Sequence, residues 1–214
     1  MKNKNILKTL VIFTLLALCA GRGYADGPEI QDLLDVNSDL TVSITKHASS
    51  VESGSINVTT GVNSGGIVSY FDIETNGTDD DYDFYLSSTF PIDGTPCSGY
   101  FGNAKLGNGY ILLGNSAAGR MPTEGAVSNA ISGVRGNKNV IAYPITITTS
   151  GDMDYEYSSG HATYGNCYKI TLNGETEGRV THSVGATPAT NTYEYTYDAA
   201  GTYQATITLS AVAK

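Results

Sequence analysis

The residues in this chain that could bind a metal or act in catalysis are three histidines and a serine in a glycine-rich segment. His47, His161 and His182 share no spacing with one another, or with a glutamate, that is typical of a zinc-binding helix. Residues 114–119 read Gly-Asn-Ser-Ala-Ala-Gly and approach the Gly-x-Ser-x-Gly turn of serine hydrolases, but Ala118 stands where the second glycine is required. The sequence therefore predicts no catalytic residues.

A cluster of aspartates, at 79–81 and at Asp83, is the densest group of charges. Calcium prefers such oxygen ligands. However, Phe84 and Phe90 occupy the places of the glycine and the closing glutamate in an EF-hand loop. Asn76-Gly77 precedes the cluster and is a strong turn signal. We therefore predict a solvated hairpin tip here, with no metal site and no cofactor.

Residues 1–25 have the pattern of a secretory signal peptide, because Lys2, Lys4 and Lys8 form a basic head and the apolar run over 7–20 is broken only by Lys8, Thr9 and Thr14. Gly23 and Ala25 are the small residues that a signal peptidase reads. A lipoprotein signal with Cys19 lipidated is the alternative, but the residue before that cysteine is not small. A membrane anchor is disfavoured, since the apolar run is shorter than the roughly 20 residues that a bilayer requires.

The exported chain is expected to be acidic, with a leader over 26–38 and one domain over 39–214. Cleavage after residue 25 removes four basic residues and no acid, which lowers the net charge from −9 to −13. This charge disfavours binding to nucleic acid or to anionic membranes, and we expect no membrane insertion after cleavage.

Two cysteines, Cys97 and Cys167, follow the signal peptide. An even pair in a compartment that permits disulfides predicts one structural bridge, worth about 4 kcal/mol in the chain-entropy model. A metal pair or a catalytic thiol is the alternative, but neither cysteine has a second cysteine or a histidine two to four residues away.

The positioning elements are predicted to be strands, because short segments rich in Val, Ile, Thr and Tyr alternate with clusters of Gly, Asn, Asp and Ser. The predicted strands are 40–46, 55–62, 67–74, 82–90, 110–114, 140–149, 168–172, 179–184, 193–197 and 203–212. Only 124–132 has the apolar spacing of a short helix. Residues 29–36 lack alternation and are predicted as a flexible leader or a helical turn. The whole indicates an all-β sandwich or barrel.

Tyrosine is frequent, with 15 residues against 5 Phe and no Trp. Tyr193, Tyr195 and Tyr197 would share one face of their predicted strand. Such rings are either half-buried core residues or an exposed platform for another subunit or a carbohydrate.

The C-terminal segment has the strictest alternation in the chain. Tyr203, Ala205, Ile207 and Leu209 alternate with polar residues, which predicts a strand with one buried and one solvated face. A terminal strand of this quality, introduced by Gly-Thr-Tyr at 201–203 in an exported chain with few cysteines, resembles the closing strand of bacterial chaperone-usher pilus subunits.

This resemblance implies an immunoglobulin-like β-sandwich that is incomplete and is completed by a donor strand from a neighbouring subunit. The acceptor groove would be formed by Tyr203, Ala205, Ile207 and Leu209. A neighbour's N-terminal extension would enter it and contribute main-chain hydrogen bonds and alternate apolar side chains.

The donor strand must itself alternate, and residues 39–46 do so, with Leu40, Val42 and Ile44 on one face. We predict this segment as the donor strand. The alternative is the first strand of a complete sandwich that pairs within its own chain. Alternation identifies a half-buried strand but not the chain in which it is buried.

The resemblance implies a structural subunit of a surface fimbria that polymerises by donor-strand exchange and contributes to adhesion. Its partners would be related subunits, a periplasmic chaperone, an outer-membrane usher and a host receptor or glycan. The chain departs from the best-known branch, whose two bridged cysteines lie in the first half, and residues 98–139 match nothing in the family.

The alternative is a self-contained secreted β-sandwich that binds carbohydrate or a host protein through its tyrosines or through 98–139. We predict that the chain is not an enzyme. A secreted hydrolase assembled from residues distant in sequence is the third class, and its histidine supply is thin.

Overall fold

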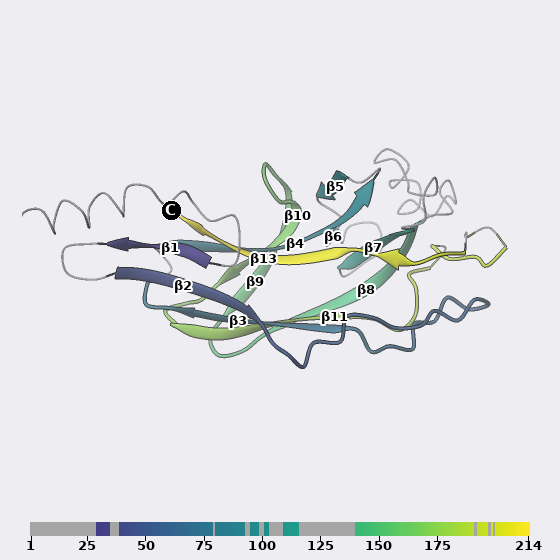
Figure 1. Ribbon diagram of the computed structural model, residues 1–214, viewed down its shortest axis with the longest axis horizontal. Helices are drawn as coiled ribbons and strands as arrows, with labels where there is room; N and C mark the ends of the chain where they lie inside the picture. The colour runs from purple at the N-terminus through teal and green to yellow at the C-terminus, as the bar shows by residue number, and fades with distance from the viewer. Residues whose placement is uncertain are drawn as a thin grey trace, which may run out of the picture.

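The computed structural model describes residues 29–34, 39–78, 80–92, 95–98, 101–102, 109–115, 140–190, 192–196, 198 and 200–214. Regular secondary structure in these ranges consists of strands, arranged in two antiparallel sheets (Figure 1). The all-β prediction is therefore confirmed, and the two sheets pack as a β-sandwich in which one sheet is curled.

Among the described residues, eight strands form the first sheet and five the second. The first sheet has the order β1 (Glu29–Leu34), β2 (Asp39–Lys46), β3 (Val68–Thr75), β11 (Glu177–Val184), β8 (Val140–Thr149), β7 (Tyr110–Asn115) and β12 (Tyr203–Gln204), and β6 (Phe101–Gly102) pairs with β7. The second has the order β13 (Thr206–Ala213), β4 (Tyr82–Ile92), β10 (Gly165–Thr171) and β9 (Asp154–His161), and β5 (Thr95–Ser98) pairs with β4.

The hydrophobic core lies between the sheets because alternate residues of each strand face inward. On β3, Phe71 and Ile73 are buried, while Asp72 between them is half-exposed. On β4, Phe84 and Leu86 are buried in the same layer. The alternation seen in the sequence thus determines which face of each strand packs in the core.

The C-terminal chain joins both sheets. Tyr203 pairs with Asn115 of β7 in the first sheet. After Ala205 the same chain pairs with β4 of the second sheet, beginning with Thr206 opposite Thr89. The predicted strand 203–212 is therefore two strands, β12 and β13, with the change of sheet between them.

The predicted strand 55–62 is wrong, because this segment folds into a turn. The Asn57 side-chain oxygen accepts hydrogen bonds from the backbone N–H groups of Thr59 and Thr60, at 3.0 and 3.1 Å. Gly61 follows with a φ of 71°, in the left-handed region that glycine favours. A local side-chain hydrogen bond thus competes successfully with strand pairing.

The predicted strand 193–197 is also wrong over its described residues 193–196, so Tyr193 and Tyr195 do not share a strand face, and Tyr197 lies outside the described residues. The Asp198 side chain accepts a hydrogen bond from the Glu194 N–H, and the Asp198 N–H donates to the Glu194 carbonyl at 2.8 Å. This closes a turn in which Tyr193 is half-buried and Tyr195 is exposed.

The N-terminal leader and the aspartate cluster also differ from the predictions. Residues 29–34 form β1, which pairs with β2, although they lack regular alternation. Asp80 and Asp81 lie between β3 and β4, and Asp83 is the second residue of β4. Because β3 and β4 belong to different sheets, this connection joins the sheets and is not the tip of a hairpin. Asp81 accepts hydrogen bonds from the backbone and side chain of Thr78, and Asp83 pairs with Lys169 at 2.9 Å.

Strand β9 was not predicted, since its sequence of Tyr, Ser, Gly and acidic residues carries little apolar alternation. The other predicted segments correspond to β2, β3, β4, β7, β8, β10 and β11 with shifts of a few residues at their ends. The predicted helix at 124–132 lies outside the described residues.

His182 is a buried polar residue in this core. Its side chain is fully buried, neither ring nitrogen has a hydrogen-bond partner among the described residues, and the centre of the Phe101 ring lies 5.5 Å from that of His182. Burial disfavours the charged imidazolium and lowers the pKa of His182 to about 4 from the ordinary 6.5.

We expect acid to destabilise the protein through His182. Below pH 6.5 the unfolded chain takes up a proton that the folded protein takes up only near pH 4, so the free energy of unfolding falls as pH falls through this window. Between pH 7.5 and pH 5 the loss should be about 2 kcal/mol. His182→Leu should remove this loss, measured by urea unfolding at both pH values. An equally large loss in a cooperatively folded variant would contradict this assignment.

A pair of like charges offers a stabilising substitution. Glu74 of β3 lies directly opposite Glu177 of β11, and like charges in that position repel. Glu177→Lys should raise the free energy of unfolding by up to about 1 kcal/mol at low salt. The matched control is Glu156→Lys, which places a lysine opposite Lys169 and should destabilise the fold. Thermal melts of both variants at low and high salt check the two signs.

Candidate strand-accepting groove

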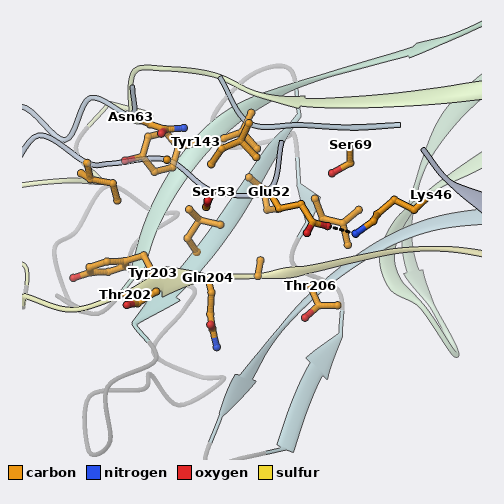
Figure 2. A pocket seen from close by; sticks show the side chains of 18 of the residues that line it. Lys46, Glu52, Ser53, Asn63, Ser69, Tyr143, Thr202, Tyr203, Gln204 and Thr206 are labelled. Carbon is orange, nitrogen blue, oxygen red and sulfur yellow. Dashed lines mark hydrogen bonds and ion pairs between the residues drawn. The ribbon is translucent and has the colours of Figure 1, made fainter. Parts of the chain in front are cut away.

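An elongated groove of about 470 Å³ lies beside the start of the C-terminal strands (Figure 2). Figure 2 shows Lys46 at one end, Glu52 reaching toward it from the middle, and Asn63, Tyr143 and Tyr203 toward the other end. The lining comes from three places: the C-terminal chain, the connection between β2 and β3, and the inner face of the first sheet. Its residues are Lys46, Glu52, Ser53, Gly54, Ile56, Asn63, Ile67, Ser69, Phe71, Ile111, Leu113, Tyr143, Val184 and Thr202 to Ile207.

The floor of the groove is apolar because it is the inner face of the curled sheet. Phe71 of β3, Ile111 of β7 and Tyr143 of β8 are all buried at this position. Burial raises the pKa of Tyr143 to about 12, and its hydroxyl donates a hydrogen bond to the Gly61 carbonyl at 2.7 Å. The floor therefore carries no charge at neutral pH and suits apolar side chains.

One wall is the connection over residues 47–67. Lys46 and Glu52 form an ion pair with 2.5 Å between Nζ and Oε1 at the rim, and such an exposed pair contributes little stability. Deeper in the wall the backbones at Gly54 and Gly65 approach closely, since a Cβ added to Gly54 would lie 2.5 Å from the Gly65 Cα. Glycine at both positions thus permits the crossing that shapes this wall.

The opposite wall is the C-terminal chain. Ala205 and Ile207 are half-buried and pack against the core. Beyond this point β13 pairs with β4 along its whole length and ends the order of the second sheet, so within the described ranges its other edge has no strand partner. An unpaired edge beside an apolar groove is the arrangement that admits an added strand.

The structure places three of the four predicted acceptor residues on this groove. Tyr203, Ala205 and Ile207 line it. Leu209 is 2% exposed and does not line it, because the side chain is already enclosed in the core. Sequence alternation therefore identified the inward-facing residues of the C-terminal segment. It did not show that Leu209 is enclosed in the core while the residues before it line the groove.

The predicted donor residues lie in β2, which pairs with β3 of the same chain and places Ile44 opposite Ile73. Val42 and Ile44 are buried in the core, and Leu40 is half-buried. In this single chain the segment therefore takes the alternative role, that of a strand in its own sandwich. Both β1 and β2 contact β13.

The predicted disulfide is not formed in this structure. Cys167 is a free, buried thiol. Cys97 pairs with Phe90 of β4 and Cys167 with Ser87 of the same strand. These partners are three residues apart along β4, or about 10 Å, whereas a disulfide requires Cα atoms about 4.4–6.8 Å apart.

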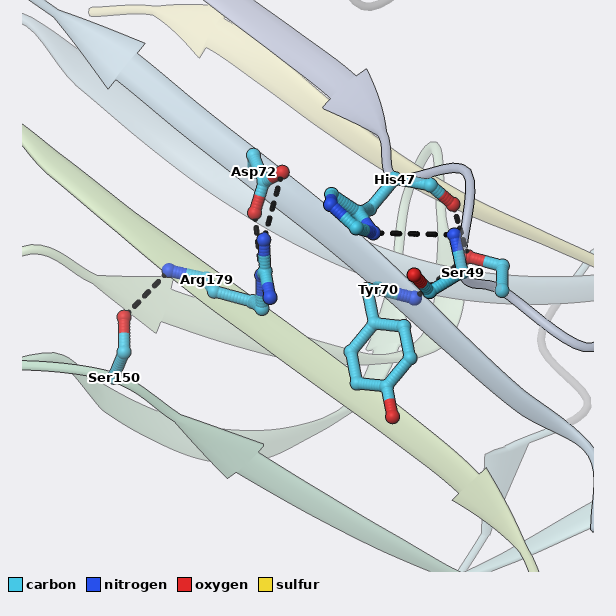
Figure 3. A network of polar contacts seen from close by, with 7 residues as sticks. His47, Ser49, Tyr70, Asp72, Ser150 and Arg179 are labelled. Carbon is cyan, nitrogen blue, oxygen red and sulfur yellow. Dashed lines mark hydrogen bonds and ion pairs between the residues drawn. The ribbon is translucent and has the colours of Figure 1, made fainter.

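A polar network lies on the outer face of the first sheet (Figure 3). The Arg179 guanidinium donates two hydrogen bonds to the Asp72 carboxylate, at 2.6 and 3.1 Å, and lowers the pKa of that carboxyl. The same guanidinium lies 5.5 Å from the centre of the Tyr70 ring, which His47 contacts edge-on. These contacts join β3 to β11 and hold the sheet that forms the groove floor.

The three histidines occupy different parts of the fold. His47 belongs to the outer network, His161 stacks with Tyr164 in the β9–β10 hairpin, and His182 is in the core. Across the described ranges no group of three or more His, Cys, Asp or Glu side chains is placed to hold a metal ion. No helix there is long and apolar enough to cross a membrane.

Comparisons with protein-family models, curated proteins and solved structures found no match to this chain.

Sequence reasoning missed the wall formed by the β2–β3 connection. Ile56 and Asn63 line the groove, but they lie in or beside the segment predicted as a strand. The one sequence signal for a turn was the Asn57 and Gly61 pair, which alternating Val and Thr residues obscured.

The cysteine assignment can be checked directly. Cys167 is fully buried, and burial raises the pKa of its thiol, so an alkylating reagent should not label it in the folded protein. In denaturant without reductant Cys167 should become labelled, as read by mass spectrometry of its peptide. Labelling of Cys167 that appears only after a reductant is added would show that the predicted disulfide does form. Wild-type protein reduced before denaturation is the control for complete labelling.

Proposed function

We propose that this chain is a structural subunit of a surface fimbria and polymerises by donor-strand exchange. The observation that carries the proposal is the unpaired edge of β13, within the described ranges, beside the apolar groove lined by Tyr203, Ala205 and Ile207. The signal-peptide pattern at residues 1–25 supports export through the periplasm to the cell surface. A periplasmic chaperone and an outer-membrane usher would be its assembly partners.

The groove supports this function because its chemistry matches an alternating strand. An extended segment placed along the open edge would gain main-chain hydrogen bonds from β13 and direct alternate apolar side chains toward Ile207 and the floor. The apolar floor at Phe71 and Ile111 offers such side chains little hydrogen bonding, so recognition there would rest on burial and shape. The completed sandwich would have an immunoglobulin-like arrangement.

Strand β2 is the donor in this proposal. Leu40, Val42 and Ile44 alternate as the groove requires, and the segment lies near the N-terminus of the exported chain. To act on a neighbour, β2 must leave β3 of its own chain and be replaced there by an equivalent contact. The apolar area that β2 loses at β3 would be offset by the area that it buries in the neighbour's groove.

A specific observation favours a second candidate, a self-contained secreted binding module. Val42 and Ile44 are already buried within their own chain, which is what a complete sandwich requires. This candidate would bind carbohydrate or a host protein and would fold as a monomer without a chaperone.

The first experiment is an SDS gel, unboiled beside boiled, of material sheared from cells that express the chain with its assembly partners. Donor-strand polymers should give a ladder that collapses to one band on boiling. A single monomer band in both lanes would reject the fimbrial function and favour the binding module.

The groove is tested by paired substitutions on adjacent residues of β13. Ile207→Asp places a charge on the inner face and should abolish the ladder, because an unpaired buried charge costs several kcal/mol. Thr208→Asp changes the exposed face and should leave the ladder intact. Ala205→Phe fills the groove without a charge and should shorten the ladder. Normal ladders from both groove variants would contradict the acceptor assignment, and circular dichroism of each purified monomer reports whether it has folded.

A further inference from the structure

The end of the molecule beyond the groove carries exposed apolar side chains, which we call the apolar tip: Val58, Val62 and Tyr195. Their side chains are 76%, 36% and 60% exposed. The turn and the segment that carry them lie at the end of the sandwich away from the C-terminus (Figure 1). The Tyr193 hydroxyl joins the two by a hydrogen bond of 2.5 Å to the Val58 carbonyl. Grouped apolar exposure of this kind marks interaction surfaces.

The tip is held in a defined conformation. The Asn57 N–H donates to the Val62 carbonyl at 2.8 Å, and the Gly61 N–H donates to the Asn57 carbonyl at 2.8 Å. The Tyr143 hydroxyl fixes the turn to the first sheet through the Gly61 carbonyl. Val58 is therefore presented to solvent by an ordered turn, and a preorganised apolar side chain loses little conformational entropy on binding.

The tip is continuous with the groove. Asn63 follows Val62 directly and lines the groove, as does Tyr203. Figure 2 places Asn63 and Tyr203 toward the end of the groove opposite Lys46. The Asn63 N–H also donates to the Ala186 carbonyl at 2.8 Å, which holds the turn beside the segment leading to Tyr195. A strand that leaves the groove at this end would thus pass the apolar tip.

The direction of an incoming strand determines where the rest of its subunit would lie. Every strand pair that the described residues form is antiparallel, and antiparallel pairing is the more stable arrangement per residue. An incoming strand antiparallel to β13 would have its C-terminal end beside Tyr203. Because β2 lies near the N-terminus of its own chain, the rest of the donor subunit would emerge at the tip.

We propose that the apolar tip is a docking surface for a second copy of this chain, the copy whose strand occupies the groove. This inference rests on the proposed function and adds a body-to-body contact to the strand exchange. The contact would cover Val58 and Tyr195 and set the angle between successive subunits.

The test uses a photo-reactive benzoylphenylalanine in place of Val58, in the full chain on cells that assemble it. Illumination should join two copies of the chain into a species that survives boiling, with crosslinked peptides from the second copy identified by mass spectrometry. The matched control carries the same residue in place of Tyr155, which is also exposed but lies on β9 at the far edge of the second sheet. It should give no such species.

The outcomes separate the two proposals. A boiling-sensitive ladder without a position-58 crosslink, or with a crosslink to a different protein, would overturn the tip contact and leave strand exchange standing. Absence of any ladder in the wild type would overturn both. A second variant, Val58→Ser with Tyr195→Ser, should still form the ladder but lower the temperature at which the sheared polymers dissociate. An unchanged dissociation temperature would contradict the contact.

Discussion

This structure depends on the burial of a single apolar layer between two sheets. The C-terminal chain covers that layer only in part. This chain belongs to the first sheet at Tyr203 and to the second from Thr206 onward. At β12 it forms the last strand of the curled sheet, whereas along β13 it leaves an edge that no described strand pairs with. Leu209 is enclosed but Ile207 is only half-buried, so the groove is the part of the core that this chain does not cover.

Sequence alternation predicted much of this arrangement because alternation is a property of single strands. It located β2, β3, β4, β7, β8, β10, β11 and the inward residues of the C-terminal chain. It failed at Asn57 and Asp198, where a polar side chain bonds to nearby backbone and forms a turn in a segment rich in strand-forming residues. It also missed β9, whose position depends on pairing with β10 and not on its own pattern.

For a related reason, only one wall of the groove could be predicted from the sequence. Ala205 and Ile207 could be assigned to an inner face from their spacing, but the opposite wall comes from a connection whose path is set by tertiary contacts. The close crossing at Gly54 and Gly65 and the contact from Tyr143 to Gly61 join residues distant in sequence. The cysteines show the same limit. Their even number in an exported chain predicted a disulfide, but Cys97 and Cys167 pair with positions on β4 that are three residues apart.

Polymerisation by strand exchange requires a gain in free energy over the isolated chain. In the proposed exchange, β2 loses its pairing with β3 when it moves to another copy, so the exchange must be favoured by something that the single chain lacks. The half-covered groove beside Ile207 supplies one such term, because filling it removes apolar surface from water. A contact at Val58 and Tyr195 would supply another, since those side chains are exposed in the isolated chain. Assembly would then be favoured by burial of surfaces that are exposed or half-covered in the single chain, and the strand that moves would connect them.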